Sequence, residues 1–451
     1  MKRIVLSLFL FPFFLISQPT LQQKIAQMVM ISFTGTVIPD SIKYDIQKRG
    51  LGGIILYANN ITSASQVKTL TAQLSALSSS QLLLSIDQEG GKVARLSASN
   101  GFAATPTALY LGTKVNREDT TRYYSALMAG WVRQSGFNID FAPVADVNVN
   151  PLSPAIGKSE RSYSADADTV ARHTGWFVEE FRKKGIITTM KHFPGHGSAT
   201  VDSHLGFTDV TNTWSSKELI PYSTAIKNGT VDMVMIGHLF NAKIDSLYPA
   251  SLSARTVNGL LRDSLKFDGV VISDALTMSA ISLNYAMDDV IERSVNSGTD
   301  ILLWNGNSYN NRSLTGYIID VVSKKISDGK IAAATIDTAY NRIQRLKQRI
   351  LTNVSRQYAG TIPSGLHLEQ NYPNPFNPST VIGFTVHHSG MTTLKIYDAL
   401  GRETAVLADE FLESGLYYTR TFDASALSAG IYFAQLRSGG AVKMVKMIYL
   451  K

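Results

Sequence analysis

Eight short apolar runs recur along the first two thirds of the chain. They are rich in β-branched residues, and most end in polar residues or glycine, a pattern typical of buried strands. Amphipathic segments with helical spacing separate most of the runs, for example Ser65–Leu77, Thr120–Gln134, Asp168–Lys184 and Ala286–Asn296. The runs are Met28–Phe33, Gly53–Tyr57, Leu82–Ile86, Ile139–Val144, Ile186–Met190, Met233–Ile236, Val270–Ile272 and Ile301–Trp304.

The alternation of continuous apolar strands with helices predicts an α/β fold with a parallel sheet that is covered on both faces. Eight repeats favour a closed (β/α)8 barrel of the TIM type. An open doubly wound sheet is the alternative, but the sequence has neither the glycine fingerprint of dinucleotide-binding folds nor a Walker-type loop. In a barrel, chemistry is expected at the residues that follow each strand.

The pattern changes after the last helical segment, Ala332–Thr352. A polar linker with Gly and Pro, Gln357–His367, leads into short alternating strands that predict a small all-β sandwich. The expected strands include Val381–Val386, Thr393–Tyr397, Gly415–Phe422 and Gly430–Leu436. The expected divisions are a signal peptide over 1–17, the barrel over 18–355, a linker over 356–368 and the sandwich over 369–451.

The first residues have the organisation of a signal peptide. Lys2 and Arg3 precede the apolar stretch Ile4–Ile16, and small or polar residues follow it. This stretch is too short for an ordinary membrane span, although an uncleaved anchor is the alternative interpretation. No later segment has the length of a span, so we expect an exported protein without a stable membrane span.

The composition of the 451 residues is that of a globular protein, with 44% hydrophobic and 17% charged residues. The absence of Cys excludes disulfides, a lipoprotein anchor and a thiolate nucleophile. The formal net charge is +8, but the basic residues are scattered rather than clustered. Nucleic-acid binding is therefore not expected.

The densest group of reactive residues follows the fifth run. It comprises Lys191–Gly197, with the sequence Lys-His-Phe-Pro-Gly-His-Gly, and then Asp202 and His204. A zinc site is one interpretation, but the first run contributes no His pair, so we expect no metal. For His196, between two glycines, a bond to loop carbonyls is the favoured interpretation. The second interpretation is a dyad in which Asp202 orients His204, whose imidazole can donate and accept a proton near neutral pH.

A candidate nucleophile follows the seventh run. Asp274 stands at the expected C-terminal end of a barrel strand, where a carboxylate can attack an anomeric carbon and form a glycosyl-enzyme. A helix N-cap is the alternative role for a single Asp in this position. No Ser stands in a Gly-x-Ser-x-Gly elbow, so Asp274 is the nucleophile that the sequence favours.

Two further polar motifs follow the third and fourth runs. The first is Ile86–Gly91 with Val93–Leu96, and the second is Ile156–Tyr163. Together with Lys191–His204 and Ser273–Asp274, these motifs resemble the bacterial β-N-acetylglucosaminidases of glycoside hydrolase family 3. The element running from Lys-His-Phe-Pro-Gly-His-Gly to Asp-Ser-His is specific to that subgroup.

The resemblance covers most of Leu21–Leu351 and implies an enzyme without a cofactor. It implies retaining, exo-acting hydrolysis of terminal β-linked N-acetylglucosamine from muropeptides or chitin oligosaccharides through a covalent glycosyl-enzyme. It makes Asp274 the nucleophile, His204 the acid/base and Asp202 the partner of His204. The residues that it assigns to substrate binding are Asp87, Arg95, Arg161, Lys191 and His192. The sequence departs from the simplest family pattern by placing Lys-Ser-Glu between Gly157 and Arg161.

Two other functions compete with this one. A β-glucosidase of the same family is the enzymatic alternative. Such enzymes commonly have a second domain that supplies the catalytic carboxylic acid, whereas the tail of this chain is predicted to be a small all-β sandwich. A surface glycan-binding protein with a decayed site is the non-enzymatic alternative. Every expected catalytic position is filled, which argues against a decayed site, so we expect the amino-sugar glycan to be a substrate and not only a bound ligand.

The tail carries a second resemblance. Asn371–Thr380, Ile396–Arg402, Ala429–Tyr432 and the ending Lys443–Lys451 resemble the C-terminal sorting domain of the type IX secretion system of Bacteroidetes. The resemblance implies a secreted or cell-surface protein whose partner is the secretion machinery. A carbohydrate-binding module is the structural alternative for a domain of this size.

Overall fold

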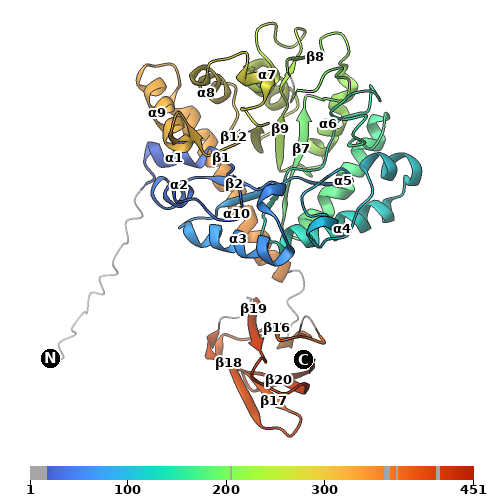
Figure 1. Ribbon diagram of the computed structural model, residues 1–451, viewed down its shortest axis with the longest axis vertical. Helices are drawn as coiled ribbons and strands as arrows, with labels where there is room; N and C mark the ends of the chain where they lie inside the picture. Colours follow the sequence, from blue (N-terminus) through green and yellow to red (C-terminus); the bar gives the residue numbers. More distant parts are fainter. Residues whose placement is uncertain (1–17, 204–205, 360–365, 372–373, 413–416, 451) are drawn as a thin grey trace, which may run out of the picture. The chain divides into compact units, whose positions relative to one another are not determined.

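The computed structural model describes residues 18–203, 206–359, 366–371, 374–412 and 417–450. The expected signal peptide therefore lies outside the described residues. The chain divides into two compact units, and the main boundary falls between Lys347 and Gln348. Each unit has its own architecture (Figure 1).

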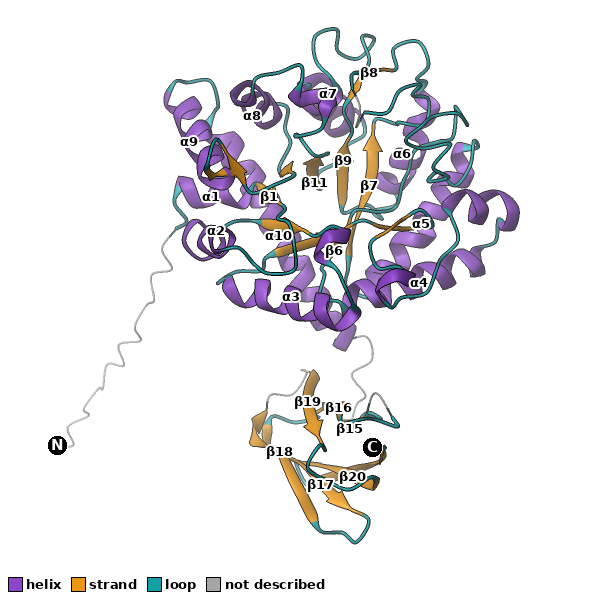
Figure 2. Cartoon of the chain, in the orientation of Figure 1, coloured by secondary structure: helices purple, strands orange, loops and turns teal. Residues whose placement is uncertain are grey.

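The first unit is built around eight parallel strands (Figure 2). Their order in the sheet is β11-β9-β7-β6-β3-β2-β1-β12. Each of the eight predicted runs overlaps one of these strands, and β7 and β11 extend beyond the ends of their runs. Their bounds are β1 Val29–Ile31, β2 Gly53–Ile55, β3 Leu83–Ile86, β6 Ile139–Asp140, β7 Ile187–Phe193, β9 Met233–Ile236, β11 Val270–Ser273 and β12 Leu302–Trp304.

The sheet closes on itself. β1 pairs with β12 in parallel, and a parallel bridge between Ile272 and Ile301 joins the segments of β11 and β12. Two further backbone bonds, from Ser273 N to Ile301 O at 3.0 Å and from Ile301 N to Val271 O at 3.0 Å, strengthen this seam. The fold is thus the predicted barrel and not the open sheet.

Helices cover the outside of the barrel because each presents one apolar stripe to the strands. α3, Ala64–Leu77, shows the rule: its N-cap Ser63 accepts a bond from Gln66 N, and its buried residues recur at helical spacing. The other α-helices are α1 Leu21–Gln27, α2 Asp40–Tyr44, α4 Glu118–Gln134, α5 Ala167–Lys183, α6 Ile220–Lys227, α7 Ser279–Ser282, α8 Met287–Asn296, α9 Leu314–Ser327 and α10 Ala333–Ala359, which begins in this unit and continues past its boundary. A further helical segment of the barrel unit is η7 Arg255–Ser264. Short strand pairs in the loops are β4 Gln88–Gly90 with β5 Val93–Ala94, β8 Thr208–Asp209 with β10 Leu239–Phe240, and β13 Ser308–Tyr309 with β14 Arg312–Ser313.

The second unit is a small β-sandwich, as predicted. Its sheets have the orders β15-β16-β19 and β18-β17-β20-β21, and buried side chains from both form one core that includes Phe384, Leu394 and Leu436. Both ends of the expected linker are ordered: α10 runs on to Ala359, and β15 pairs with β16. The strands are β15 His367–Leu368, β16 Ser379–Thr385, β17 Gly390–Asp398, β18 Glu403–Leu412, β19 Tyr417–Asp423, β20 Gly430–Ser438 and β21 Ala441–Tyr449.

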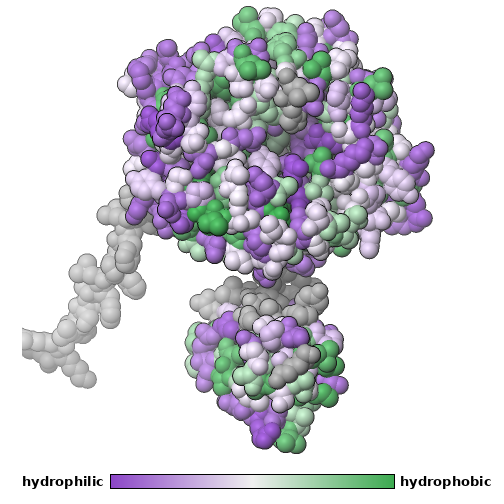
Figure 3. Space-filling view, in the orientation of Figure 1, coloured by the Kyte–Doolittle hydropathy of each residue, from purple (hydrophilic) through white to green (hydrophobic). Residues whose placement is uncertain are grey.

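The visible face of the barrel unit is mainly hydrophilic, with scattered hydrophobic residues (Figure 3). This distribution is that of a protein whose apolar side chains lie in its core. In the part of the chain that the structure describes, none of the helices combines the length and the apolar content that a membrane span requires.

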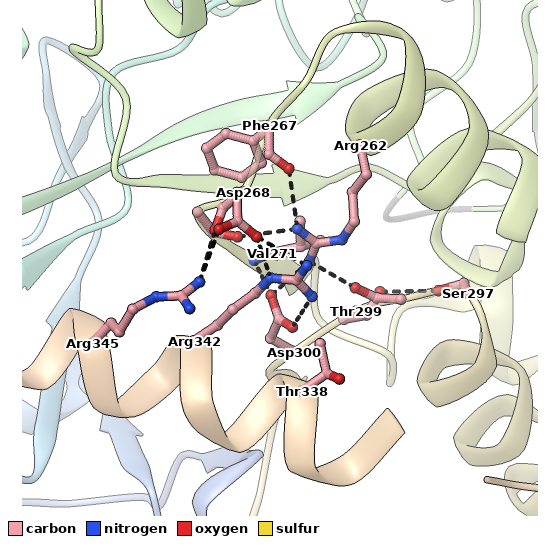
Figure 4. A network of polar contacts seen from close by, with 12 residues as sticks. Arg262, Phe267, Asp268, Val271, Ser297, Thr299, Asp300, Thr338, Arg342 and Arg345 are labelled. Atoms are coloured by element: carbon pink, nitrogen blue, oxygen red, sulfur yellow. Dashed lines mark hydrogen bonds and ion pairs between the residues drawn. The ribbon is translucent and has the colours of Figure 1, made fainter. Parts of the chain in front are cut away.

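A network of charged side chains fixes α10 at the N-terminal end of the last strands (Figure 4). Asp300 is almost fully buried and accepts bonds from Arg262 Nη2 at 2.7 Å and Val271 N at 2.8 Å. From α10, Arg342 reaches Asp300 at 3.4 Å and Asp268 at 3.1 Å, whereas Arg345 reaches only Asp268, at 3.0 Å. Residues at the N-terminal face of a barrel usually contribute to stability and not to chemistry.

The two α10 arginines should differ in their contribution to stability. Arg342→Met removes a charged donor from a buried carboxylate, so the free energy of unfolding should fall by about 1–3 kcal/mol. Arg345→Met affects a pair that is mostly exposed and should change it by no more than about 0.5 kcal/mol. Urea unfolding followed by Trp fluorescence measures this, because all four Trp residues lie in the barrel unit. Equal losses in both variants would contradict the network.

Candidate active site

The predicted functional residues gather at the C-terminal mouth of the barrel. Asp87 follows β3, and Asp274 follows β11. Lys191 and His192 lie near the C-terminal end of β7. The carboxyl ends of parallel strands meet at one rim, so residues far apart in sequence come together there. The depth at which they lie differs: Lys191 and His192 are buried, whereas Asp87 and Asp274 are partly exposed.

Two carboxylates and three cations form a compact ion cluster on one side of the mouth. Lys191 Nζ contacts Asp87 Oδ1 and Glu89 Oε1, both at 2.7 Å. Arg161 binds Glu89 with two parallel bonds of 2.8 and 2.7 Å, and Arg95 Nη2 lies 3.3 Å from Asp87 Oδ2. Such two-pronged Arg–carboxylate pairs fix orientation as well as charge.

The charges of this cluster hold one another in the ionised state. Burial favours the neutral acid at Glu89, but Arg161 and Lys191 outweigh it and lower the pKa of this carboxyl far below its usual range. Burial acts in the same direction at Asp87, and the charges of Lys191 and Arg95 again lower the pKa. The pKa of Lys191 is raised, because its two carboxylates overcome the burial that would lower it. Lys191 is therefore a fixed positive charge at neutral pH.

Another carboxylate, that of the fully buried Asp146, contacts the His residues at the end of β7 and in the loop that follows. Asp146 Oδ2 lies 2.7 Å from His192 Nδ1, and Asp146 Oδ1 accepts bonds from the backbone N of His192 and of His196 at 3.1 and 2.7 Å. His192 Nε2 lies 3.3 Å from Arg161 Nη2, which can only donate. Nδ1 of His192 accordingly carries the proton that Asp146 accepts.

The backbone around Asp274 is held from the neighbouring strand and from its own loop. Asp274 N donates to Ile236 O at 2.9 Å, and Ala275 N donates to Asp274 Oδ1 at 2.7 Å. Asp274 starts a loop and does not cap α7, which begins at Ser279, so the N-cap interpretation is not what the structure shows.

Tyr57, after β2, connects the Asp87 and Asp274 sides of the mouth. Its hydroxyl donates to Asn305 Oδ1 at 2.5 Å, and Arg95 Cζ lies 5.8 Å from the centre of its ring. Burial raises the pKa of Tyr57, and the negative charges of Asp87 and Asp274 raise it further. The phenol therefore stays protonated and keeps the bond that it donates to Asn305.

The loop after β7 is anchored beneath by buried polar groups. His196 Nε2 lies 3.0 Å from Ser203 Oγ, and Gly197 N donates to Glu218 Oε2 at 2.9 Å. Burial lowers the pKa of His196 to about 4 and raises that of Glu218 to about 8. Gly195 has a φ of 123° and lies against Glu218, so a side chain there would clash. Asp202 is partly exposed, and His204 lies outside the described residues.

The structure thus brings together five predicted binding residues, namely Asp87, Arg95, Arg161, Lys191 and His192. The extra residues before Arg161 form a turn in which Glu160 has a φ of 57°, and Arg161 still reaches the cluster. Sequence reasoning missed the roles of Tyr57, Asp146 and Glu218. Two of them could have been found from their positions, because Tyr57 ends a predicted strand and Asp146 follows another by two residues. Within the described ranges, no three His, Asp or Glu side chains are placed to hold a metal ion.

Comparisons with known proteins show to which family this chain belongs. The family model described as the glycosyl hydrolase family 3 N-terminal domain matches residues 20–346. The chain is 32% identical over 276 residues to a beta-hexosaminidase of Pseudomonas aeruginosa strain LESB58, a match covering 60% of this chain and 80% of that protein. The chain belongs to glycoside hydrolase family 3.

Other relatives of this family 3 chain support the assignment. Beta-hexosaminidase A of Pseudoalteromonas piscicida is 32% identical over 289 residues, and the match spans about half of that protein, 48%, and 59% of this chain. A family 3 beta-N-acetylglucosaminidase from Paenibacillus sp. str. FPU-7 has a TM-score of 0.69 at 32% identity, covering 78% of this chain and 70% of that one. The beta-N-acetylhexosaminidase of Beutenbergia cavernae has a TM-score of 0.68 at 27% identity, covering 73% and 99%. These matches confirm the expected enzyme class, a glycosidase of the β-N-acetylhexosaminidase kind.

The tail of the family 3 chain matches a second model. Residues 370–450 fit the secretion system C-terminal sorting domain. This match confirms the predicted sorting domain, and it indicates export to the cell surface or the medium with the secretion machinery as partner.

The buried carboxyl of Glu218 should make stability depend on pH. Because burial raises the pKa of Glu218 to about 8, the folded protein keeps the proton up to that pH, whereas the unfolded chain loses it near the usual Glu pKa of 4.5. Stability should therefore fall as the pH rises between these values. Glu218→Gln keeps an acceptor for Gly197 N and should flatten this fall, as measured by urea unfolding across the range. Glu179→Gln, at a partly exposed position on α5, is the matched control and should leave the slope unchanged. An unchanged slope in Glu218→Gln would contradict the assignment.

Proposed function

We propose that this protein is a retaining, exo-acting β-N-acetylglucosaminidase. Its substrates are muropeptides or chitin oligosaccharides with a terminal β-linked N-acetylglucosamine. The observation that carries the proposal is the buried ion cluster of Asp87, Glu89 and Lys191, which shares the barrel mouth with Asp274. The names of the family 3 relatives support the choice of sugar.

The ion cluster suits the recognition of sugar hydroxyls. Side-chain exposure is 14% at Asp87 but only 6% at Glu89 and 3% at Lys191. We infer that Asp87 accepts bonds from the sugar, while Glu89 holds the cations from below. Lys191, Arg95 and Arg161 would donate to the sugar's oxygen atoms, and the unprotonated Nε2 of His192 would accept a bond from a sugar hydroxyl. Contacts at several points hold the ring so that its anomeric carbon faces the nucleophile.

The reaction would proceed in two steps. A carboxylate oxygen of Asp274 forms a bond to the anomeric carbon, the bond from that carbon to the leaving oxygen breaks, and His204 gives its proton to the leaving oxygen. Water then gives a proton to His204 and attacks the same carbon, which releases Asp274 and the sugar. Asp202 would orient His204 and stabilise its charged form. Apart from this water, both steps need only groups of this chain, so we propose no metal and no cofactor.

The domain organisation completes the proposal. We infer a signal peptide over 1–17, a hydrolase barrel over 18–355, a linker over 356–368 and the sorting domain over 369–451. The polar cluster lies wholly within the barrel, so the barrel would carry the catalysis and the sandwich would direct export.

Azide rescue distinguishes the two catalytic roles in one experiment. With nitrophenyl β-N-acetylglucosaminide, Asp274→Ala and His204→Ala should each lose about 10³-fold or more of their activity. Azide should restore activity to Asp274→Ala, because it can attack the anomeric carbon from the side that the carboxylate has vacated, and the product should be the α-glycosyl azide. In His204→Ala the covalent glycosyl-enzyme still forms, so azide should give the β-glycosyl azide.

Two outcomes would contradict the proposal. One is the same anomer of the glycosyl azide from both variants, and the other is inactivation of the wild type by EDTA with recovery on addition of zinc. The matching β-glucoside should be hydrolysed much more slowly.

A further inference from the structure

A buried His on the neighbouring strand lies directly behind the loop of Asp274. His238 follows β9 by two residues, and its side chain is 1% exposed. Its Nε2 lies 2.9 Å from Ala275 O, and its Nδ1 lies 2.7 Å from Ser251 Oγ. Ser251 is itself fully buried. The imidazole therefore bridges a fixed serine and the residue after Asp274.

The chemistry of these partners sets the direction of each bond. A carbonyl oxygen can only accept, so Nε2 of His238 carries a hydrogen and donates it to Ala275 O. Nδ1 of the neutral ring then accepts the hydroxyl hydrogen of Ser251. Ala275 in turn donates its N–H to Asp274 Oδ1 at 2.7 Å. Hydrogen bonds thus lead from Ser251 through His238 to the carbonyl of Ala275, and the N–H of the same residue continues the path to the carboxylate of Asp274.

The segment that carries His238 is itself closely fitted. Ile236 O accepts the backbone N–H of Asp274 at 2.9 Å, and Gly237 N donates to Phe193 O at 2.9 Å. A side chain at Gly237 would come within 3.0 Å of His192 Cβ. The end of β9 therefore contacts both the sugar-binding strand β7 and the loop of Asp274, which leaves little freedom for His238 to move.

We propose that His238 is a positioning residue for the nucleophile. It fixes the carbonyl of Ala275, and the N–H of the same residue, which belongs to the preceding peptide group, holds Asp274 Oδ1. The carboxylate therefore keeps one orientation toward the anomeric carbon. The proposal rests on the proposed role of Asp274. Asp274 lies in a loop rather than in a strand or helix, so its orientation depends on such side-chain contacts. A displacement of about 1 Å at a reacting group can cost about 10²-fold in rate.

The test measures covalent labelling of the full-length protein by a 5-fluoro β-N-acetylglucosaminyl fluoride. Fluoride leaves without a proton, so the labelling rate reports the nucleophile and not the acid. His238→Gln can place an amide N–H where Nε2 stands and should label at close to the wild-type rate. His238→Asn, whose shorter side chain cannot reach Ala275 O, should label on the order of 100-fold more slowly. Ser251→Ala keeps the bond from His238 to Ala275 O, so its labelling rate should lie between those of the two His238 variants.

Product binding separates positioning from general damage. All variants should bind free N-acetylglucosamine with the wild-type Kd, because the ion cluster is untouched. Labelling of His238→Asn at the wild-type rate would overturn the inference, and so would a loss of binding that parallels its loss of rate. If His238→Asn fails to fold, a folded but slow His238→Gln would overturn it, and a fast one would support it. Labelling of the wild type at a residue other than Asp274 would instead overturn the proposed function.

Discussion

The mouth of the barrel depends on the buried contact between Glu89 and the two cations Lys191 and Arg161. A charge in such a place is tolerated only if its partners compensate for the lost water, and removal of one partner leaves an uncompensated charge. The three side chains come from different parts of the chain, so their pairing fixes the ends of β3 and β7 and the turn that carries Arg161. Asp87 and His192 take their positions from this frame.

Much of the barrel could be predicted because its signals are local. Eight apolar runs and the stripes of the helices follow directly from periodicity, and the position after each run identifies the mouth. The long extension of α10 to Ala359 was not predicted, because its polar sequence resembles a linker as much as a solvent-facing helix. The predicted apolar run Ile139–Val144 also contains Asp140, whose pKa burial raises well above its usual value. A neutral Asp is compatible with such a run, but only the structure reveals its burial.

The candidate site was predictable where a residue stands in a motif and hidden where its role depends on distant partners. Asp87, Lys191 and Asp274 follow strands, so their position was evident. Asp146 and His238 each hold the backbone or ring of another residue through contacts across the barrel. No spacing in the sequence reveals such contacts, because they arise when neighbouring strands align their ends. The roles of His204 and Asp202 stay predictions of the sequence.

Retention of anomeric configuration is the central claim, because it follows from a nucleophile at Asp274 and not from the family fold alone. The most direct measurement is proton NMR of the sugar that the full-length protein first releases from a β-linked N-acetylglucosaminide. Two displacements at the anomeric carbon return it to its starting configuration, so the β-anomer should appear first and only later equilibrate with the α-anomer. Initial release of the α-anomer would mean a single displacement by water and would contradict the account.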